Sequence, residues 1–133
     1  MSLPFAVWAP LAGFANEVLV VVRLIMGVTM IYYGWPKVRD PKKNAADFAS
    51  IGFEPGWFWG TGVLVVEFFG GIAILLGFYA WIAAALMACH MATGTVWKIT
   101  KTDKRFTDWS YDLLLLTLSL ALLAFGPGRY AFP

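Results

Sequence analysis

The chain has 133 residues, of which 60% are hydrophobic and only 14% are charged. Soluble domains are about 45–50% apolar and about 25% charged, so this composition leaves too much apolar surface for water. It excludes an intrinsically disordered chain, and the net charge of +2 is too small to indicate a nucleic-acid partner. We therefore expect an all-α protein, an integral membrane four-helix bundle in contact with the lipid bilayer.

The cysteine and histidine counts narrow the chemistry further. Cys89 is the only cysteine and His90 is the only histidine. A single cysteine allows no internal disulfide, no CxxC redox pair and no thiolate zinc site. A single histidine excludes bis-histidine haem ligation within the chain. We expect no metal site and no covalently bound cofactor.

Four stretches are long and apolar enough to cross a bilayer, which takes about 20 residues in a helix. They cover approximately residues 17–35, 57–77, 79–97 and 109–126 of a single domain spanning residues 1–133. The second and third stretches almost abut, which predicts a tight antiparallel hairpin. Residues 1–16 carry two prolines and no basic residue, and we expect this segment to lie at the membrane interface.

Proline and glycine mark where the spans should stop. Pro36 is expected to end the first helix, because proline lacks the amide donor and disfavours helix at the preceding residue. The sequence Gly126-Pro127-Gly128 is expected to end the fourth helix.

Basic residues predict the orientation of the spans. They cluster after the first and third stretches, at Lys37, Arg39, Lys42, Lys43, Lys98, Lys101, Lys104 and Arg105, and only Arg129 follows the opposite ends. Both clusters belong to loops on one side of a four-span protein. The positive-inside rule places these loops in the cytoplasm and both termini outside.

Three ionisable side chains lie well inside the predicted spans, namely Arg23, Glu67 and His90, and Asp112 lies about one turn inside the fourth. A rise of about 1.5 Å per residue puts the first three at roughly 12–18 Å from the cytoplasmic ends. A lone charge at this depth costs several kcal/mol. We therefore expect Arg23 and Glu67 to pair beside a polar pocket, and Asp112 to lie near Lys37 or Lys98.

The small residues favour the same interior faces. At helical spacing, Arg23 shares its face with Gly27, Met30 and Gly34, Glu67 with Gly60, Gly70, Gly71 and Ile74, and His90 with Ala83, Met87 and Gly94. The glycines and the alanine among them allow close helix contact. Alternative readings stay open. The charges could form a purely structural ion pair, His90 could be a satisfied core histidine, and Tyr32 and Tyr33 could be interfacial aromatics.

Several motifs, taken in order, resemble those of the DoxX family. They are Arg23-Leu24…Gly27 with Tyr33-Gly34-Trp35-Pro36-Lys37, then Phe48…Gly52…Pro55, then Glu67…Gly70-Gly71…Leu75-Leu76-Gly77, and finally Gly126-Pro127-Gly128…Tyr130. The resemblance implies a multi-pass protein of the bacterial or archaeal inner membrane. It also implies a small subunit of a quinone-linked oxidoreductase complex. Within it, Arg23 and Glu67 match membrane-embedded charged positions, and Lys37 matches the lysine that ends the first signature.

The first functional hypothesis is accordingly a quinone-binding subunit. A quinone head needs donors for two carbonyl oxygens and a route for protons, and the candidate ligand-binding residues are Arg23, Glu67, His90, Tyr32, Tyr33, Asp112 and Lys37, with Phe68 beside the ring. The chain has no evident electron carrier, so a soluble or membrane redox partner would dock at the cytoplasmic loops, and an oligomer is compatible with the sequence. Whether the chain is itself catalytic stays open.

Two other classes of function compete with this hypothesis. One is a scaffold or assembly factor that docks soluble redox enzymes through residues 37–55 and 98–108. The other is a small proton-coupled transporter, which the expected neutralisation of Glu67 by Arg23 disfavours.

Overall fold

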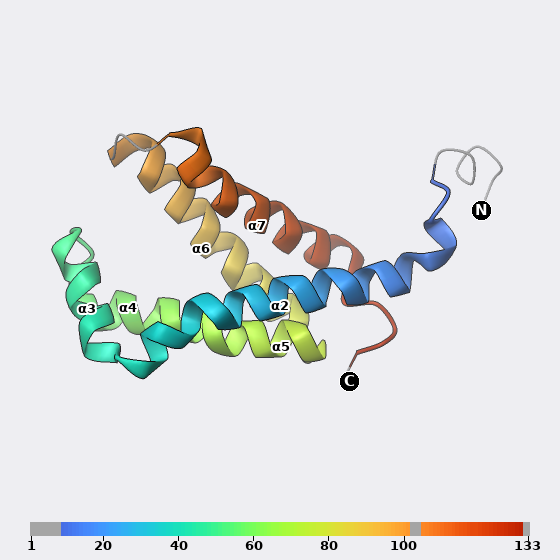
Figure 1. The fold of residues 1–133 in the computed structure, drawn as a ribbon, viewed down its shortest axis with the longest axis horizontal. Helices are drawn as coiled ribbons and strands as arrows, with labels where there is room; N and C mark the ends of the chain where they lie inside the picture. Colours follow the sequence, from blue (N-terminus) through green and yellow to red (C-terminus); the bar gives the residue numbers. More distant parts are fainter. Residues whose placement is uncertain (1–8, 102–104, 132–133) are drawn as a thin grey trace.

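The computed structural model describes residues 9–101 and 105–131, and these residues form helices joined by short turns (Figure 1). The elements in chain order are the short 3₁₀ turn η1 (Ala12–Phe14), α2 (Ala15–Arg39), α3 (Pro41–Ser50), α4 (Gly56–Leu64), the π-helical segment η2 (Val65–Phe69), α5 (Gly70–Leu76), α6 (Ala80–Lys101) and α7 (Phe106–Phe125). The protein is therefore an all-α bundle, as the composition predicts. Residues 1–8 of the expected interfacial segment, and Lys104 of the second basic loop, lie outside the described residues.

Within residues 9–101 and 105–131, four continuous helical stretches are long and apolar enough to cross a membrane. They are Ala12–Arg39, Gly56–Leu76, Ala80–Lys101 and Phe106–Phe125. The second stretch contains α4, η2 and α5 in direct succession, so a π-helical turn interrupts it in the middle. Every stretch overlaps one of the stretches expected from the hydropathy pattern, with ends that differ by a few residues.

The helices are arranged as two pairs. Helix α2 packs along η2 and α5, α7 packs against α6, and the two pairs meet where α5 contacts α6. A three-residue turn connects α5 to α6, and Gly77 occupies it with a φ of +76°, a conformation that favours glycine. From this junction, α6 and α7 diverge from α2 and the second span (α4, η2 and α5). The gap widens toward the end of the molecule that carries α3 (Figure 1).

The crossing of α2 and α5 depends on two glycines that face each other. A Cβ atom added at Gly27 would lie 2.8 Å from the carbonyl oxygen of Gly71, and one added at Gly71 would lie 2.9 Å from the carbonyl oxygen of Gly27. Helix backbones approach this closely in membranes only where side chains are small. The expected small-residue faces of these two helices therefore do meet.

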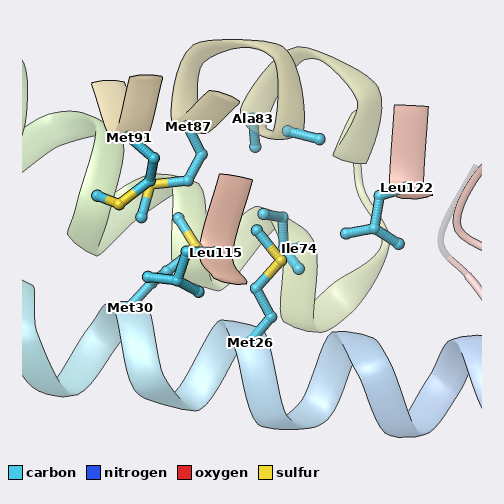
Figure 2. Packing of buried hydrophobic residues seen from close by; sticks show 9 residues of the cluster. Met26, Met30, Ile74, Ala83, Met87, Met91, Leu115 and Leu122 are labelled. Carbon is cyan, nitrogen blue, oxygen red and sulfur yellow. The ribbon is translucent and has the colours of Figure 1, made fainter. Parts of the chain in front are cut away.

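The buried core between the helix pairs is rich in methionine (Figure 2). Met26 and Met30 extend from α2, and Met87 and Met91 extend from α6, with Ile74, Leu115 and Leu122 packed among them. Methionine is unbranched and flexible, so it fills irregular space between helices that are not parallel. The methionine side chains of the core can therefore adjust to the irregular space where the two helix pairs diverge.

The prediction that Pro36 ends the first helix is wrong. Helix α2 continues through Pro36 to Arg39, and the amide of Asp40 still donates to the Pro36 carbonyl. The extra turn carries Lys37, which forms an ion pair with Glu67. The ion pair and the start of α3 at Pro41 stabilise the helical turn after Pro36. This stabilisation offsets the cost of a proline inside the helix.

The first basic loop contains a helix that the hydropathy pattern did not reveal. Asp40 caps α3 by accepting a hydrogen bond from the Lys43 amide at 3.1 Å, and Pro41 occupies its first position. Helix α3 packs on α4, where the buried Asn44 amide donates to the Gly60 carbonyl at 2.8 Å. The loop is thus a folded cover over the start of the second span.

Replacing Gly27 with alanine should lower stability by about 1–3 kcal/mol, because the new methyl group would force the α2 and α5 backbones apart. The matched control is Gly62→Ala on α4, where an added Cβ meets no atom within 4 Å. That variant should be as stable as the original protein, or more stable by up to about 1 kcal/mol through helix propensity. Thermal unfolding in detergent measures both, and equal stability of the two variants would contradict the close crossing.

The predicted orientation can be tested with single cysteines in a Cys89→Ser background. Lys42 on α3 is exposed and therefore suits as the reporter for the first basic loop. A membrane-impermeant maleimide should label Lys42→Cys only after cells are permeabilised, and should label the exposed Arg129→Cys in intact cells. The reverse pattern would invert the topology.

Candidate functional site

The carboxylate of Glu67 is the centre of the polar interior. Its Oε1 and Oε2 atoms each accept a hydrogen bond from Lys37 Nζ at 2.6 Å, and Oε1 also lies 3.1 Å from His90 Nε2. The Glu67 side chain is 7% exposed, whereas that of Lys37 is 28% exposed and that of His90 is 22% exposed. Three helical stretches therefore contribute one side chain each to a charge cluster inside the membrane-spanning region.

Local backbone geometry brings these side chains together. Glu67 is the middle residue of the π-helical segment η2, and π-helical turns widen a helix and occur frequently at functional sites. On α2, a Cβ added at Gly34 would lie 2.8 Å from the backbone nitrogen of Phe68, so the two backbones nearly touch. This close approach puts Lys37, less than one turn beyond Gly34, within reach of Glu67.

A second ion pair joins α6 and α7. Lys98 Nζ lies 2.8 Å from Asp112 Oδ2, and the Asp112 side chain is 10% exposed. Gly94, one turn before Lys98, leaves room for the carboxylate, since a Cβ there would lie 3.4 Å from Asp112 Oδ2. Of the two partners expected for Asp112, Lys98 is therefore the one it contacts.

Both ion pairs line a single cavity of about 740 Å³. The wall also includes Tyr33 from α2 and Tyr111 from α7, whose ring centroids are 5.5 Å apart. The rest of the wall is mainly apolar and aromatic, and includes Met30, Met87, Met91, Val63, Val66, Phe53, Phe58, Trp59, Trp97 and Leu115. Small-molecule sites of about 300–1,000 Å³ have this composition, with a few polar groups on an apolar wall.

The expected pairing of Arg23 with Glu67 is wrong. Arg23 instead donates to four backbone carbonyls, from Nε to Ile74 at 3.1 Å, from Nη2 to Leu75 at 3.0 Å, and from Nη1 to Pro127 at 3.1 Å and Tyr130 at 2.6 Å. Arg23 and Lys37 are about 21 Å apart along α2 at 1.5 Å per residue. The arginine therefore fixes the C-terminal segment to the end of α5, far from the cavity.

The remaining candidates divide clearly. Lys37, Glu67, His90, Tyr33 and Asp112 all line the cavity. Tyr32 does not contribute to this wall, because it lies on the outer face of α2, is 72% exposed and contacts only the edge of the Tyr33 ring among described aromatics. Phe68 also lies elsewhere, with its ring centroid 6.0 Å from that of Trp35.

Sequence reasoning identified neither the polar cavity residues Lys98 and Tyr111 nor most of the apolar wall, including Trp59 and Trp97, as parts of the site. A signal for Lys98 was present, since His90, Gly94 and Lys98 follow at intervals of four on one helical face. Tyr111 carried no such signal, because its neighbour Asp112 is the inward-facing residue by periodicity, and only the divergence of the helix pairs exposes Tyr111 to the cavity.

The cavity offers hydrogen-bond donors at two places, each beside a carboxylate that can accept a proton. The ammonium of Lys37 and the imidazole of His90 surround the Glu67 carboxylate, and the ammonium of Lys98 and the hydroxyl of Tyr111 lie with Asp112 on the other pair of helices. Such a site can bind a flat apolar molecule with polar atoms at its edges. It can also exchange a proton with such a molecule through the carboxylates or the imidazole.

A double-mutant cycle should separate the observed pair from the expected one. Lys37→Met leaves a buried carboxylate with only His90, so it should cost roughly 1–3 kcal/mol, whereas Lys37→Met combined with Glu67→Gln should recover part of this loss. The control cycle of Arg23→Met with Glu67→Gln should be additive within about 0.5 kcal/mol, because these residues share no partner. Coupling between Arg23 and Glu67, measured by unfolding in detergent, would contradict this geometry.

Comparison with known proteins gives one match. The DoxX family model matches residues 18–99, which include Lys37, Glu67, His90 and Lys98 but not Asp112. None of the curated proteins and none of the solved structures matches the chain. The match covers more than half of the chain and agrees with a small four-span membrane protein, so the chain belongs to the DoxX family.

Proposed function

We propose that this protein is a subunit of a quinone-linked oxidoreductase complex of the bacterial or archaeal inner membrane, and that it binds a quinone or a similar small molecule in the cavity between the helix pairs. The observation that carries the proposal is the Glu67 carboxylate, held by Lys37 and His90 in the wall of a largely apolar cavity of about 740 Å³. A charge cluster of this kind is costly in a membrane, and such clusters commonly mark ligand or proton sites.

The chemistry of a quinone fits this wall. A quinone ring is flat and apolar and has two carbonyl oxygens, which accept hydrogen bonds from groups such as Lys37, His90 or Tyr111. Its reduction to the quinol takes up two electrons and two protons. Glu67 with His90 on one side, and Asp112 with Lys98 on the other, are the groups that would supply or accept those protons.

The electrons would come from a partner. One histidine is too few for bis-histidine haem ligation, and one cysteine is too few to hold an iron–sulfur cluster. The end of the molecule that carries α3 is here called the loop end. Exposed cations near it offer a docking surface for the partner, and they include Arg39, Lys42, Lys43, Lys101 and Arg105. The same surface would also serve a scaffold that holds soluble enzymes without binding a quinone. The cavity favours the quinone-binding subunit over this alternative.

A proton-coupled transporter is less well supported. A transporter that exchanges a proton for a cation needs a carboxylate whose counter-ion the substrate can replace. Glu67 is instead engaged by two groups at 2.6 and 3.1 Å, one of which is a lysine ammonium.

Quinone that remains bound through purification tests the proposal. Solvent extraction and mass spectrometry should find quinone in the purified protein, and His90→Leu should reduce the bound amount roughly tenfold or more, as expected for one lost hydrogen bond to a polar ligand atom. Lys37 still pairs with Glu67 in this variant, so the fold should persist. Thr100→Leu is the control, because Thr100 is an exposed polar residue of the same helix outside the cavity. Equal quinone contents in the two variants would refute a role for the cavity.

A further inference from the structure

The cavity has two sides where the helix pairs diverge, and an aromatic contact bridges one of them. On the side between α2 and α7, the rings of Tyr33 and Tyr111 meet with centroids 5.5 Å apart. At the loop end, Phe53 lies between Trp59 of α4 and Trp97 of α6, with ring centroids 6.2 Å from each. Ring contacts therefore bridge the cavity toward α7 and at the loop end.

The side between α4 and α6 is different. Within the described residues, α4 packs on α3 and η2, while α6 packs on α7 and α5, and few backbone contacts join α4 to α6. Five cavity residues on these two helices are also exposed at the surface, namely Phe58, Trp59 and Gly62 on α4 and Cys89 and Thr93 on α6. Because both helices belong to membrane-spanning stretches, this opening faces lipid. We name it the α4–α6 slot.

We propose that the ligand of the cavity is an amphiphile with a long apolar tail, and that it enters sideways from the bilayer through the α4–α6 slot while its tail stays in lipid. The inference rests on the proposed function and narrows its ligand class to tailed quinones or similar lipids. The polar head meets Lys37, Glu67 and His90 at the inner end of the slot, and the apolar lips contact the start of the tail.

A helix from another protein is a poorer occupant of this slot. A membrane-spanning helix of 20 residues is about 30 Å long and 10 Å wide, which corresponds to roughly 2,400 Å³. The cavity measures about 740 Å³ and ends at a cluster of charged side chains. Such a volume suits a head group and the first part of a tail.

Two threonines of α6 provide a matched pair of variants. Thr93 and Thr100 are both exposed, and each hydroxyl donates to the carbonyl four residues earlier, at 2.8 and 2.7 Å. Only Thr93 lines the cavity. Thr93→Trp therefore narrows the slot, whereas Thr100→Trp adds the same bulk outside it. Gly62→Leu narrows the opposite lip, with Gly13→Leu as its control, since an added Cβ meets no atom within 4 Å at either glycine.

The probes are a dimethoxybenzoquinone head without a tail and the same head with two isoprene units. Binding to nanodiscs that contain the protein is measured against empty nanodiscs, so that partition into lipid cancels. In Thr93→Trp and Gly62→Leu, the tailed probe should bind at least tenfold more weakly than in the original protein, and the tailless probe should change less than twofold. Thr100→Trp and Gly13→Leu should leave both probes unchanged.

The remaining outcomes separate the two proposals. Equal weakening of both probes, or of neither, by the slot variants would overturn the sideways entry and leave quinone binding in place. Binding of neither probe to the original protein would overturn the proposed function and the slot with it. A larger or smaller assembly in Thr93→Trp than in Thr100→Trp would identify the slot as a protein contact and overturn the proposal.

Discussion

A carboxylate inside a membrane needs a positive partner, and the placement of Glu67 organises much of this protein. Its charge would be unstable alone in the low-dielectric interior of the bundle. Lys37 and His90 satisfy it, and they come from α2 and α6, so one side chain connects both helix pairs. The cluster thus joins the two halves of the bundle at the depth where they begin to diverge.

Close backbone contacts make this cluster reachable. The facing pair Gly27 and Gly71 lets α2 lie directly on α5, and Gly34 lets it lie on the π-helical segment that carries Glu67. Larger residues would force these helices apart and lengthen the distance between Lys37 and Glu67. The glycines therefore contribute to the site without touching a ligand, because they set the distance between the groups that do.

The divergence of the helix pairs creates the volume that a ligand requires. The cavity wall includes Met30, Met87 and Met91, whose flexible side chains tolerate non-parallel packing. At the loop end, aromatic rings from the α3–α4 connection, α4 and α6 contact one another. Aromatic and ion-pair contacts across the gap take the place of continuous helix packing. The same design leaves the α4–α6 slot open toward lipid.

The sequence by itself determined the four apolar stretches, the tight turn at Gly77 and the inward faces, because hydropathy and helical periodicity depend only on local spacing. It placed Glu67 and His90 on those faces, and Asp112 near Lys37 or Lys98, of which Lys98 is the partner. Periodicity does not determine how far one helix slides along another. Lys37 is two residues from the end of α2, while Glu67 is eleven residues from the start of α4, so the helices are staggered and Glu67 meets Lys37 rather than Arg23. Only tertiary packing, through the glycine contacts and the turn beyond Pro36, decided that stagger and with it the composition of the cavity.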